Sequence, residues 1–147
     1  MSSHIVRQAV IGSREYPRLD FVRHYVSTLH TSTIVVSGGA RGVDKQAQDA
    51  AEVRGLTVDI YPADWTRNGK AAGFIRNQQI ADHADRVTAF WDGSSRGTID
   101  CVVRFHEQRK WITVYAATGA SIPMADILVW AERNGIWAAS GVRRASV

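Results

Sequence analysis

The sequence predicts an α/β protein: a single Rossmann-like domain with a parallel sheet of about five strands, helices on both faces and a C-terminal helical tail. Two observations support this fold class. Short apolar segments rich in valine and isoleucine alternate with amphipathic segments of about ten to fifteen residues, the order that right-handed crossovers between parallel strands require. Three of the apolar segments also end in turns of glycine and other small residues, where sheets of this class bind their ligands.

The apolar segments have the lengths of strands and end at proline, glycine or polar residues. The expected strands are residues 7–11, 33–36, 57–61, 86–91 and 111–115. Between them, apolar residues recur every three or four positions, as at Val22, Val26 and Leu29, which places them on one face of a helix. The expected helices are residues 19–29, 42–54, 71–84, 98–109 and 124–133. Residues 63–70 are polar and aromatic, and we expect a loop there that folds over a site.

Length and composition predict one globular domain over residues 1–117, with residues 118–147 as a helical extension that packs on it or serves oligomerisation. The single cysteine, Cys101, excludes a disulfide framework and a Cys-x-x-Cys metal site, which favours a reducing compartment. No apolar run approaches the ~18 residues of a membrane span, so we expect a cytoplasmic protein without membrane contact. The histidines lack i,i+4 pairing with carboxylates, and no metal site is expected.

The charge balance is moderately basic. Lysine and arginine number 18 against 14 aspartates and glutamates, which gives a net charge of +4 and an isoelectric point near 9.6. Because no long basic run is present, this excess suits a phosphate-bearing ligand, and nucleic acid is not expected as a partner.

The segment from Val35 to Asp44 leads from a strand through a glycine-rich turn into a helix. Gly38 and Gly39 permit positive φ and close approach of a ligand, while the helix that begins at Gly42 offers unpaired N–H groups and a partial positive charge. Such a turn suits an anion such as phosphate. Taken alone, the segment is explained equally well as a tight turn.

Two further turns favour a binding site. Parallel strands end at one edge of a sheet, so the turns at residues 12–14, 37–39 and 92–98 are expected to meet there. The sequence contains neither Gly-x-Gly-x-x-Gly after the first strand nor Gly-x-x-x-x-Gly-Lys-Ser/Thr, which argues against a dinucleotide dehydrogenase and a P-loop ATPase.

The stretches Val10-Ile11-Gly12-Ser13-Arg14, Val36 to Asp44, Arg76-Asn77 and Ala89 to Thr98 resemble the YspA/YpsA-related branch of the SLOG superfamily. The resemblance covers residues 6–115 and leaves the tail outside. This superfamily is similar in fold to LOG phosphoribohydrolases, molybdenum cofactor carrier proteins and the DNA-processing protein DprA. The resemblance implies a Rossmannoid fold that binds nucleotides or nucleotide-derived molecules, and a role in bacterial or phage conflict.

One departure from the LOG enzymes concerns catalysis. Those enzymes carry Pro-Gly-Gly-x-Gly-Thr-x-x-Glu and an upstream arginine, which Arg76 matches here. Gly97 and Thr98 match the Gly-Thr pair, but Cys101 stands where the glutamate is expected. Asp100 comes one residue too early, which rotates it by ~100° on a helix. This departure favours binding over catalysis. The catalytic candidates that are kept are Arg76, Asp92 and Asp100.

Charged residues at the turns are assigned roles from their chemistry. Arg14 and Arg76 are expected to clamp phosphate, because a guanidinium pairs with it in bidentate geometry. Asp44 is expected either to cap its helix or to bind a ribose, and Asp92 to meet a ribose hydroxyl.

Aromatic residues are candidates for stacking on a base. Trp65 is preferred, with Trp91 and Tyr16 as alternatives that core packing explains equally well. The full set of expected ligand-binding residues is Gly12, Ser13, Arg14, Ser37, Gly38, Gly39, Gly42, Asp44, Trp65, Arg76, Asn77, Asp92, Gly93, Ser94, Gly97 and Thr98.

Three functional hypotheses result. The first is a sensor, carrier or sequestering protein for a nucleotide-like small molecule, with no required cofactor and with homo-oligomers expected. The second is an N-glycosidase or phosphoribohydrolase that acts on a nucleoside phosphate. The third is DprA-like binding of single-stranded DNA, which we rank last because residues 65–70 alone combine basic and aromatic side chains.

Overall fold

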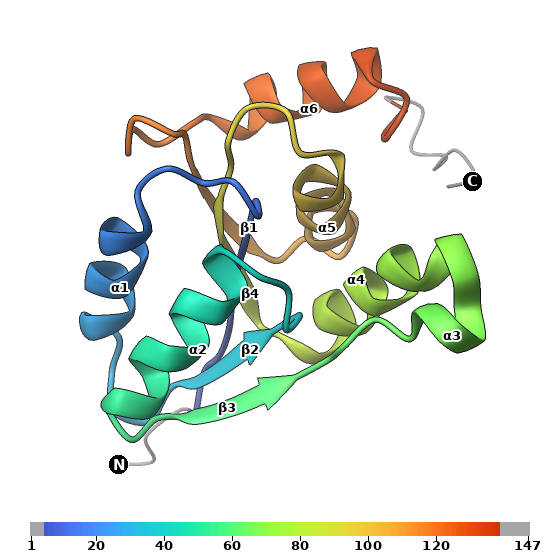
Figure 1. Ribbon diagram of the computed structural model, residues 1–147. Helices are drawn as coiled ribbons and strands as arrows, with labels where there is room; N and C mark the ends of the chain where they lie inside the picture. Colours follow the sequence, from blue (N-terminus) through green and yellow to red (C-terminus); the bar gives the residue numbers. More distant parts are fainter. Residues whose placement is uncertain (1–4, 139–147) are drawn as a thin grey trace.

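The computed structural model describes residues 5–138. Its centre is a five-stranded parallel sheet with the strand order β3-β2-β1-β4-β5 (Figure 1). The strands are β1 (Arg7–Gly12), β2 (Ile34–Ser37), β3 (Thr57–Ile60), β4 (Arg86–Phe90) and β5 (Trp111–Tyr115). The α/β, Rossmann-like fold class predicted from the sequence is confirmed.

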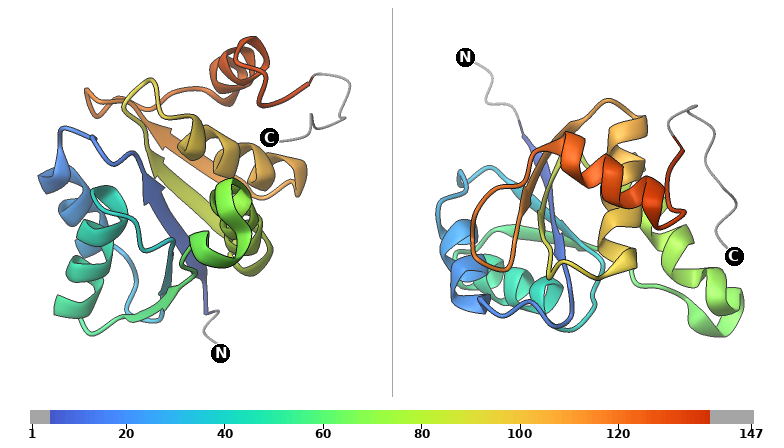
Figure 2. Two further views of the ribbon diagram at one scale, coloured as in Figure 1. Left: turned by 45° about the vertical axis from the view of Figure 1, so that its right-hand side comes forward. Right: turned by 90° about the horizontal axis from the view of Figure 1, so that it is seen from above.

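Helices cover both faces of the sheet. They are α1 (Leu19–Ser27), α2 (Val43–Val53), α3 (Trp65–Asn68), the 3₁₀ helix η1 (Gly69–Ala71), α4 (Ala72–His83), α5 (Arg96–Glu107) and α6 (Met124–Arg133). Helices α1 and α2 lie on one side of the sheet, and α4 and α5 lie on the other (Figure 2). The crossovers therefore change side after β3, which places β1 and β4 next to each other at the centre of the sheet.

The predicted loop at residues 63–70 is wrong, because this segment forms α3 and η1. Asp64 starts α3 as its N-cap, and its Oδ1 accepts a hydrogen bond of 3.0 Å from the Arg67 backbone N–H. A side-chain acceptor at this position satisfies a donor that the first turn leaves free. The short helix directs the Trp65 side chain away from the core, and this residue is 53% exposed.

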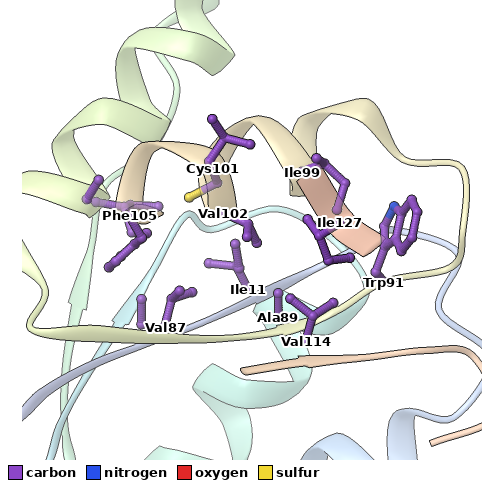
Figure 3. Packing of buried hydrophobic residues seen from close by; sticks show 14 of the residues in the cluster. Ile11, Val87, Ala89, Trp91, Ile99, Cys101, Val102, Phe105, Val114 and Ile127 are labelled. Atoms are coloured by element: carbon purple, nitrogen blue, oxygen red, sulfur yellow. The ribbon is translucent and has the colours of Figure 1, made fainter. Parts of the chain in front are cut away.

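Two apolar clusters hold the layers together, and alternate residues of each strand point into one or the other. On the α1 side, Phe90 makes edge-to-face contacts with Tyr16, Phe21 and Tyr25 at centroid distances of 5.6 Å. On the other side, side chains from the sheet pack against α5 and α6 (Figure 3). Burial on both faces is what a parallel sheet requires.

Helix α6 follows β5 and packs on α5 through Ile127 and Ala131, both fully buried. Trp130 of this helix meets Trp91 edge-to-face at 4.8 Å. The division into residues 1–117 and 118–147 stays a prediction, and residues 139–147 lie outside the described part of the chain. Within residues 5–138, no helix has both the length and the apolar character needed to cross a membrane.

Candidate functional site

A cavity of about 560 Å³ opens at the carboxyl ends of β1 and β4. These strands are neighbours, but the helices that follow them cover opposite faces, and open α/β sheets bind ligands in the crevice at such a point. The walls come from the end of β1, the turn before α2, the segment from α3 to α4, and the start of α5. The cavity thus lies where the predicted turns meet.

The cavity gathers more than half of the residues that the sequence nominated. Those that line it are Gly12, Arg14, Asp44, Trp65, Arg76, Asn77, Asp92, Gly97 and Thr98. The other nominated residues do not line it; they are Ser13, Ser37, Gly38, Gly39, Gly42, Gly93 and Ser94. Ligand binding by either group stays a prediction.

The glycines of the turn before α2 make room for neighbouring walls of the cavity. Gly42 has φ = 80°, and a Cβ there would lie 2.5 Å from the Arg14 carbonyl oxygen. A Cβ at Gly38 would lie 2.6 Å from Nη1 of Arg76. Close approach of a ligand was expected at Gly38, whereas in the structure the Arg76 guanidinium occupies the space there.

The turn before α5 is ordered by its own side chains. Asp92 Oδ1 accepts hydrogen bonds from the backbone N–H groups of Ser94 (2.9 Å) and Ser95 (2.8 Å). Burial pushes the pKa of Asp92 upward, but these donors outweigh burial and hold the pKa below its ordinary value. Ser95 is the N-cap of α5 and accepts from the Thr98 N–H. The Asp92 carboxylate therefore stabilises the turn, and the predicted ribose contact would compete with these bonds.

Ser13 links this turn to the end of β1. Its Oγ accepts a hydrogen bond of 3.0 Å from the Asp92 N–H and lies 3.3 Å from the Thr98 hydroxyl. Ser13 is 1% exposed and Thr98 5% exposed. Since both hydroxyls are buried and paired, they fix two walls of the cavity relative to each other.

Asp44 is a buried carboxylate in the first turn of α2 and lines the cavity. Its Oδ2 accepts from the Ala40 N–H at 3.2 Å, while Oδ1 is buried without a hydrogen-bond partner within residues 5–138. Burial raises the pKa of Asp44 to about 6, although Arg76 and nearby backbone N–H groups act in the opposite direction. Gly42, rather than Asp44, occupies the N-cap position of α2.

Asp100, a catalytic candidate from the sequence, is turned into the protein. It is 2% exposed, lies outside the cavity lining, and accepts hydrogen bonds from Arg104 Nε (2.9 Å) and Asn77 Nδ2 (3.0 Å). A carboxylate enclosed by these donors does not reach a ligand in the cavity. The structure thus removes Asp100 from the candidates that face the site.

Cationic side chains outnumber carboxylates around the cavity. The cations that line it are Arg14, Arg41, Lys70, Arg76 and Arg96, and the carboxylates are Glu15, Asp44 and Asp92. Within the described part of the chain, the side chains of Arg14, Lys70 and Arg96 make no hydrogen bond or ion pair. Arg41 pairs with Glu15 at 2.8 Å, but both side chains are about 70% exposed, and such a pair contributes little.

Arg41, Lys70 and Arg96 were not among the residues nominated from the sequence. Their positions could have indicated them: Arg41 and Arg96 each directly precede a glycine of a strand-end turn, and Lys70 directly follows Gly69 in the polar segment. Cations at this edge of a sheet face the same crevice as the turns themselves.

Of the three aromatic residues proposed for stacking, the structure leaves one exposed. Trp65 lines the cavity, as does the half-buried Phe74. The predictions for the other two are wrong: Tyr16 is 3% exposed and donates its hydroxyl to the Ala116 carbonyl, and Trp91 is 6% exposed and packs in the core. Large aromatic surfaces gain more from burial than from exposure at a strand end.

Comparison with known proteins gives a fold neighbour. The structure is similar to the DNA-processing protein A (DprA) of Streptococcus pneumoniae, with a TM-score of 0.64 and 21% identity over 76% of this chain and 50% of that one. DprA of Helicobacter pylori superimposes with a TM-score of 0.58 and 19% identity, over 87% of this chain and 73% of that one. That structure was described for its single-stranded DNA binding mode. These likenesses concern the fold.

In sequence, the chain is 40% identical over 75 residues to the Gene 61 protein of Mycobacterium phage D29. The match covers 47% of this chain and 60% of that relative, so the chain spans less than two thirds of its length. No family model matches the chain.

These findings correct two predictions. The small-molecule nucleotide receptor, ranked first, and the N-glycosidase, ranked second, are overturned by the DprA neighbours, which match the third hypothesis. The expectation that nucleic acid is not a partner is wrong for the same reason. The net charge of +4 is summed over the whole chain and does not show where the charges lie. In the fold, five cationic side chains and three carboxylates line the cavity at the carboxyl edge of the sheet.

Proposed function

We propose that the cavity at the carboxyl edge of the sheet binds single-stranded DNA. The observation that carries this proposal is a cavity with five cationic side chains in its lining and a half-exposed tryptophan beside them. Phosphates bind the cations, and an unpaired base stacks on Trp65. The protein acts as a binding module in this proposal.

The phosphate contacts follow from the unpaired cations. Arg14 and Arg96 extend from the turns after β1 and β4, and Lys70 extends from η1, so the three converge on the cavity from different elements. Neutralising phosphates with such side chains releases counterions, which supplies most of the affinity of sequence-independent binding. The exposed positions leave these cations free to follow a flexible backbone.

The preference for a single strand follows from Trp65. Its indole is 53% exposed and lines the cavity, as Phe74 also does. Stacking on an aromatic side chain requires a base whose face is free, which duplex DNA does not offer. Such stacking tolerates every base, so little sequence preference is expected.

The DprA-like fold supports this proposal, since a protein of similar fold, DprA of Helicobacter pylori, was described for its single-stranded DNA binding mode. Membership in the YspA/YpsA-related branch, with the SLOG superfamily role that it implies, stays a prediction from sequence.

Fluorescence anisotropy with a labelled single strand, and with the duplex of the same sequence, tests the proposal. Wild type is expected to prefer the single strand and to lose affinity as salt rises. Arg14→Gln is expected to lower the slope of log affinity against log salt by about 0.7, the value for one phosphate contact on a single strand. Trp65→Ala is expected to weaken binding by about 1–3 kcal/mol with little effect on stability.

Arg109→Asn is the matched control. Arg109 lies between α5 and β5, at the opposite edge of the sheet, and its φ of 56° is one that asparagine adopts readily. This change removes the same charge as Arg14→Gln. If both variants change the salt slope equally, or if duplex binds as tightly as single strand, the proposal is wrong.

A further inference from the structure

A chain of buried polar contacts runs from α5 through α4 to the turn after β2. Arg104 binds the Asp100 carboxylate with Nε at 2.9 Å and Nη2 at 3.2 Å. Asp100 accepts from Asn77 Nδ2 at 3.0 Å. The amide oxygen of Asn77 accepts from Arg76 Nε at 3.1 Å, and Arg76 Nη1 donates to the Gly38 carbonyl at 2.6 Å.

The inner members of this chain are removed from water. Asn77, Asp100 and Arg104 are 7%, 2% and 8% exposed, in an interface between α4 and α5 where apolar side chains surround them and Arg104 Nη1 also donates to Gln78 Oε1 at 2.8 Å. Replacing a buried ion pair by apolar residues of similar volume is often neutral or stabilising. Helix packing therefore does not require these charges, and their geometry indicates another role.

The Asp100 carboxylate determines which way the Asn77 amide points. An ionised carboxylate accepts hydrogen bonds but donates none, so the Asn77 NH₂ group must face it. The same NH₂ group also donates to the Gly97 carbonyl at 3.2 Å. With the NH₂ group held on this side, the amide oxygen faces Arg76 and provides the acceptor for its Nε–H.

Arg76 is thereby held on the cavity wall. Its Nε and Nη1 are engaged by Asn77 and Gly38, and Nη2 makes no hydrogen bond within residues 5–138. A Cβ at Gly38 would lie 2.6 Å from Nη1, so the turn after β2 has a glycine where the guanidinium rests. A guanidinium fixed in this way loses little conformational freedom when it binds a phosphate.

We propose that Asp100 is a positioning residue: it orients the Asn77 amide, and the amide in turn fixes the Arg76 guanidinium for a phosphate in the cavity. The part of this inference that concerns phosphate rests on the proposed DNA binding. The part that concerns Arg76 does not, because the contacts exist in the protein by itself.

The first experiment observes Arg76 directly. In ¹⁵N-labelled protein, the Nε–H resonance of Arg76, identified by its absence in Arg76→Lys, is expected to be sharp and to exchange slowly with water. In the double variant Asp100→Leu/Arg104→Met, which keeps the interface filled, this resonance is expected to broaden or vanish. Should that variant fail to fold, Asp100→Val/Arg104→Leu, which also removes the acceptor for Asn77, is measured instead, with the same loss expected. An unchanged Arg76 resonance in the folded variant overturns the inference.

The second experiment measures single-strand affinity in a double-mutant cycle. Arg76→Gln is expected to weaken binding about tenfold, the value of one hydrogen-bonded charge. Asp100→Leu/Arg104→Met is expected to weaken it by a similar factor, and the triple variant by little more, because both changes remove the same contact. Independent, multiplying losses would show that Asp100 acts through general structure and would overturn the positioning role.

Asp59→Asn is the control for loss of an ion pair elsewhere, since Asp59 pairs with Arg7 away from the cavity. It is expected to leave both the Arg76 resonance and the affinity unchanged. If the wild type binds no single strand, the proposed function fails, while the Arg76 resonance still decides the positioning role of Asp100.

Discussion

The turns before α2 and α5 both border the cavity, but they are stabilised in different ways. The turn before α5 is held by its own side chains, with Asp92 accepting from two backbone N–H groups and Ser95 capping the helix. The turn before α2 has no side-chain cap at Gly42; Asp44 accepts from the Ala40 N–H, and the Gly38 carbonyl in addition receives Arg76 from α4. Because the turn before α2 receives Arg76 from another helix, substitutions that displace Arg76 should destabilise it. We expect changes of pH and glycine substitutions to affect the stability contributed by the two turns differently.

The largest difference is expected in the pH dependence of stability. Burial raises the pKa of Asp44 to about 6 from 3.8, so the native state binds this proton more tightly than the unfolded state does. The contribution of Asp44 to stability is therefore greatest below about pH 4 and is lost as pH rises through about 6. At 1.36 kcal/mol for each pKa unit, the loss is about 3 kcal/mol.

Asp92 has the opposite sign, because its pKa is held below the ordinary value and its contribution is lost as pH falls below about 4. Urea unfolding of wild type, Asp44→Asn and Asp92→Asn between about pH 2.5 and 7 measures both effects. The stability of wild type relative to Asp44→Asn should fall with rising pH, and that relative to Asp92→Asn should rise. A stability difference between wild type and Asp44→Asn that stays constant with pH would contradict a buried carboxylate with a raised pKa.

The second prediction compares glycines of the two turns. Gly38→Ala places a methyl group 2.6 Å from Arg76 Nη1 and 2.9 Å from Asp44 Oδ2, which should destabilise the protein by about 2 kcal/mol. Gly97→Ala, in the first turn of α5, meets no atom within 4 Å and should be neutral or stabilising by less than about 1 kcal/mol. Thermal unfolding of the two variants measures the difference in stability. Equal stability losses in both variants would show that the Arg76 side chain moves aside from the added methyl group without destabilising the protein.

The third prediction concerns the cap of α5. Ser95→Ala removes the acceptor for the Thr98 N–H and should cost about 1 kcal/mol. Ser94→Ala is the control, since the exposed Ser94 hydroxyl contacts Asp92 at 3.3 Å and does not cap the helix. Chemical denaturation should rank Ser95→Ala as clearly less stable than Ser94→Ala. The reverse order would argue against a self-sufficient turn.

The smallest expected effect links the turn before α2 to the proposed DNA binding. As pH falls from about 7 to 5, Asp44 takes up a proton and the cavity loses a negative charge. Single-strand affinity should then rise about threefold more in wild type than in Asp44→Asn, as expected for one partly screened charge. Anisotropy titrations at constant ionic strength measure the difference, and parallel pH profiles for both proteins would refute it.

Much of the fold could be predicted because it depends on local patterns. The strands at residues 7–11 and 57–61 and the helix at 124–133 lie within a residue or so of their predicted bounds, since apolar periodicity and breaking residues define them. The loop predicted at residues 63–70 is wrong because its polar composition hid a capped turn of helix at Asp64. Polarity indicates exposure, and exposed segments form helices as well as loops.

For the site, the sequence nominated the edge of the sheet where the cavity lies and turns such as 12–14 and 92–98, because parallel strands must end together. It could not decide which side chains at that edge face the cavity. Asp100 turns inward to Arg104, and Trp91 packs on Trp130, whereas Arg96 faces the cavity. Those orientations depend on neighbours from other elements.

The sequence by itself determined the order of strands and helices and the small residues at the strand ends, because these depend on interactions between residues close in the chain. The tertiary structure decided the charge of the cavity and the placement of Arg76. The Arg76 guanidinium meets Gly38 in the turn after β2 and, through Asn77, Asp100 from α5. Contacts between residues so far apart in sequence form only once the sheet has brought their elements together.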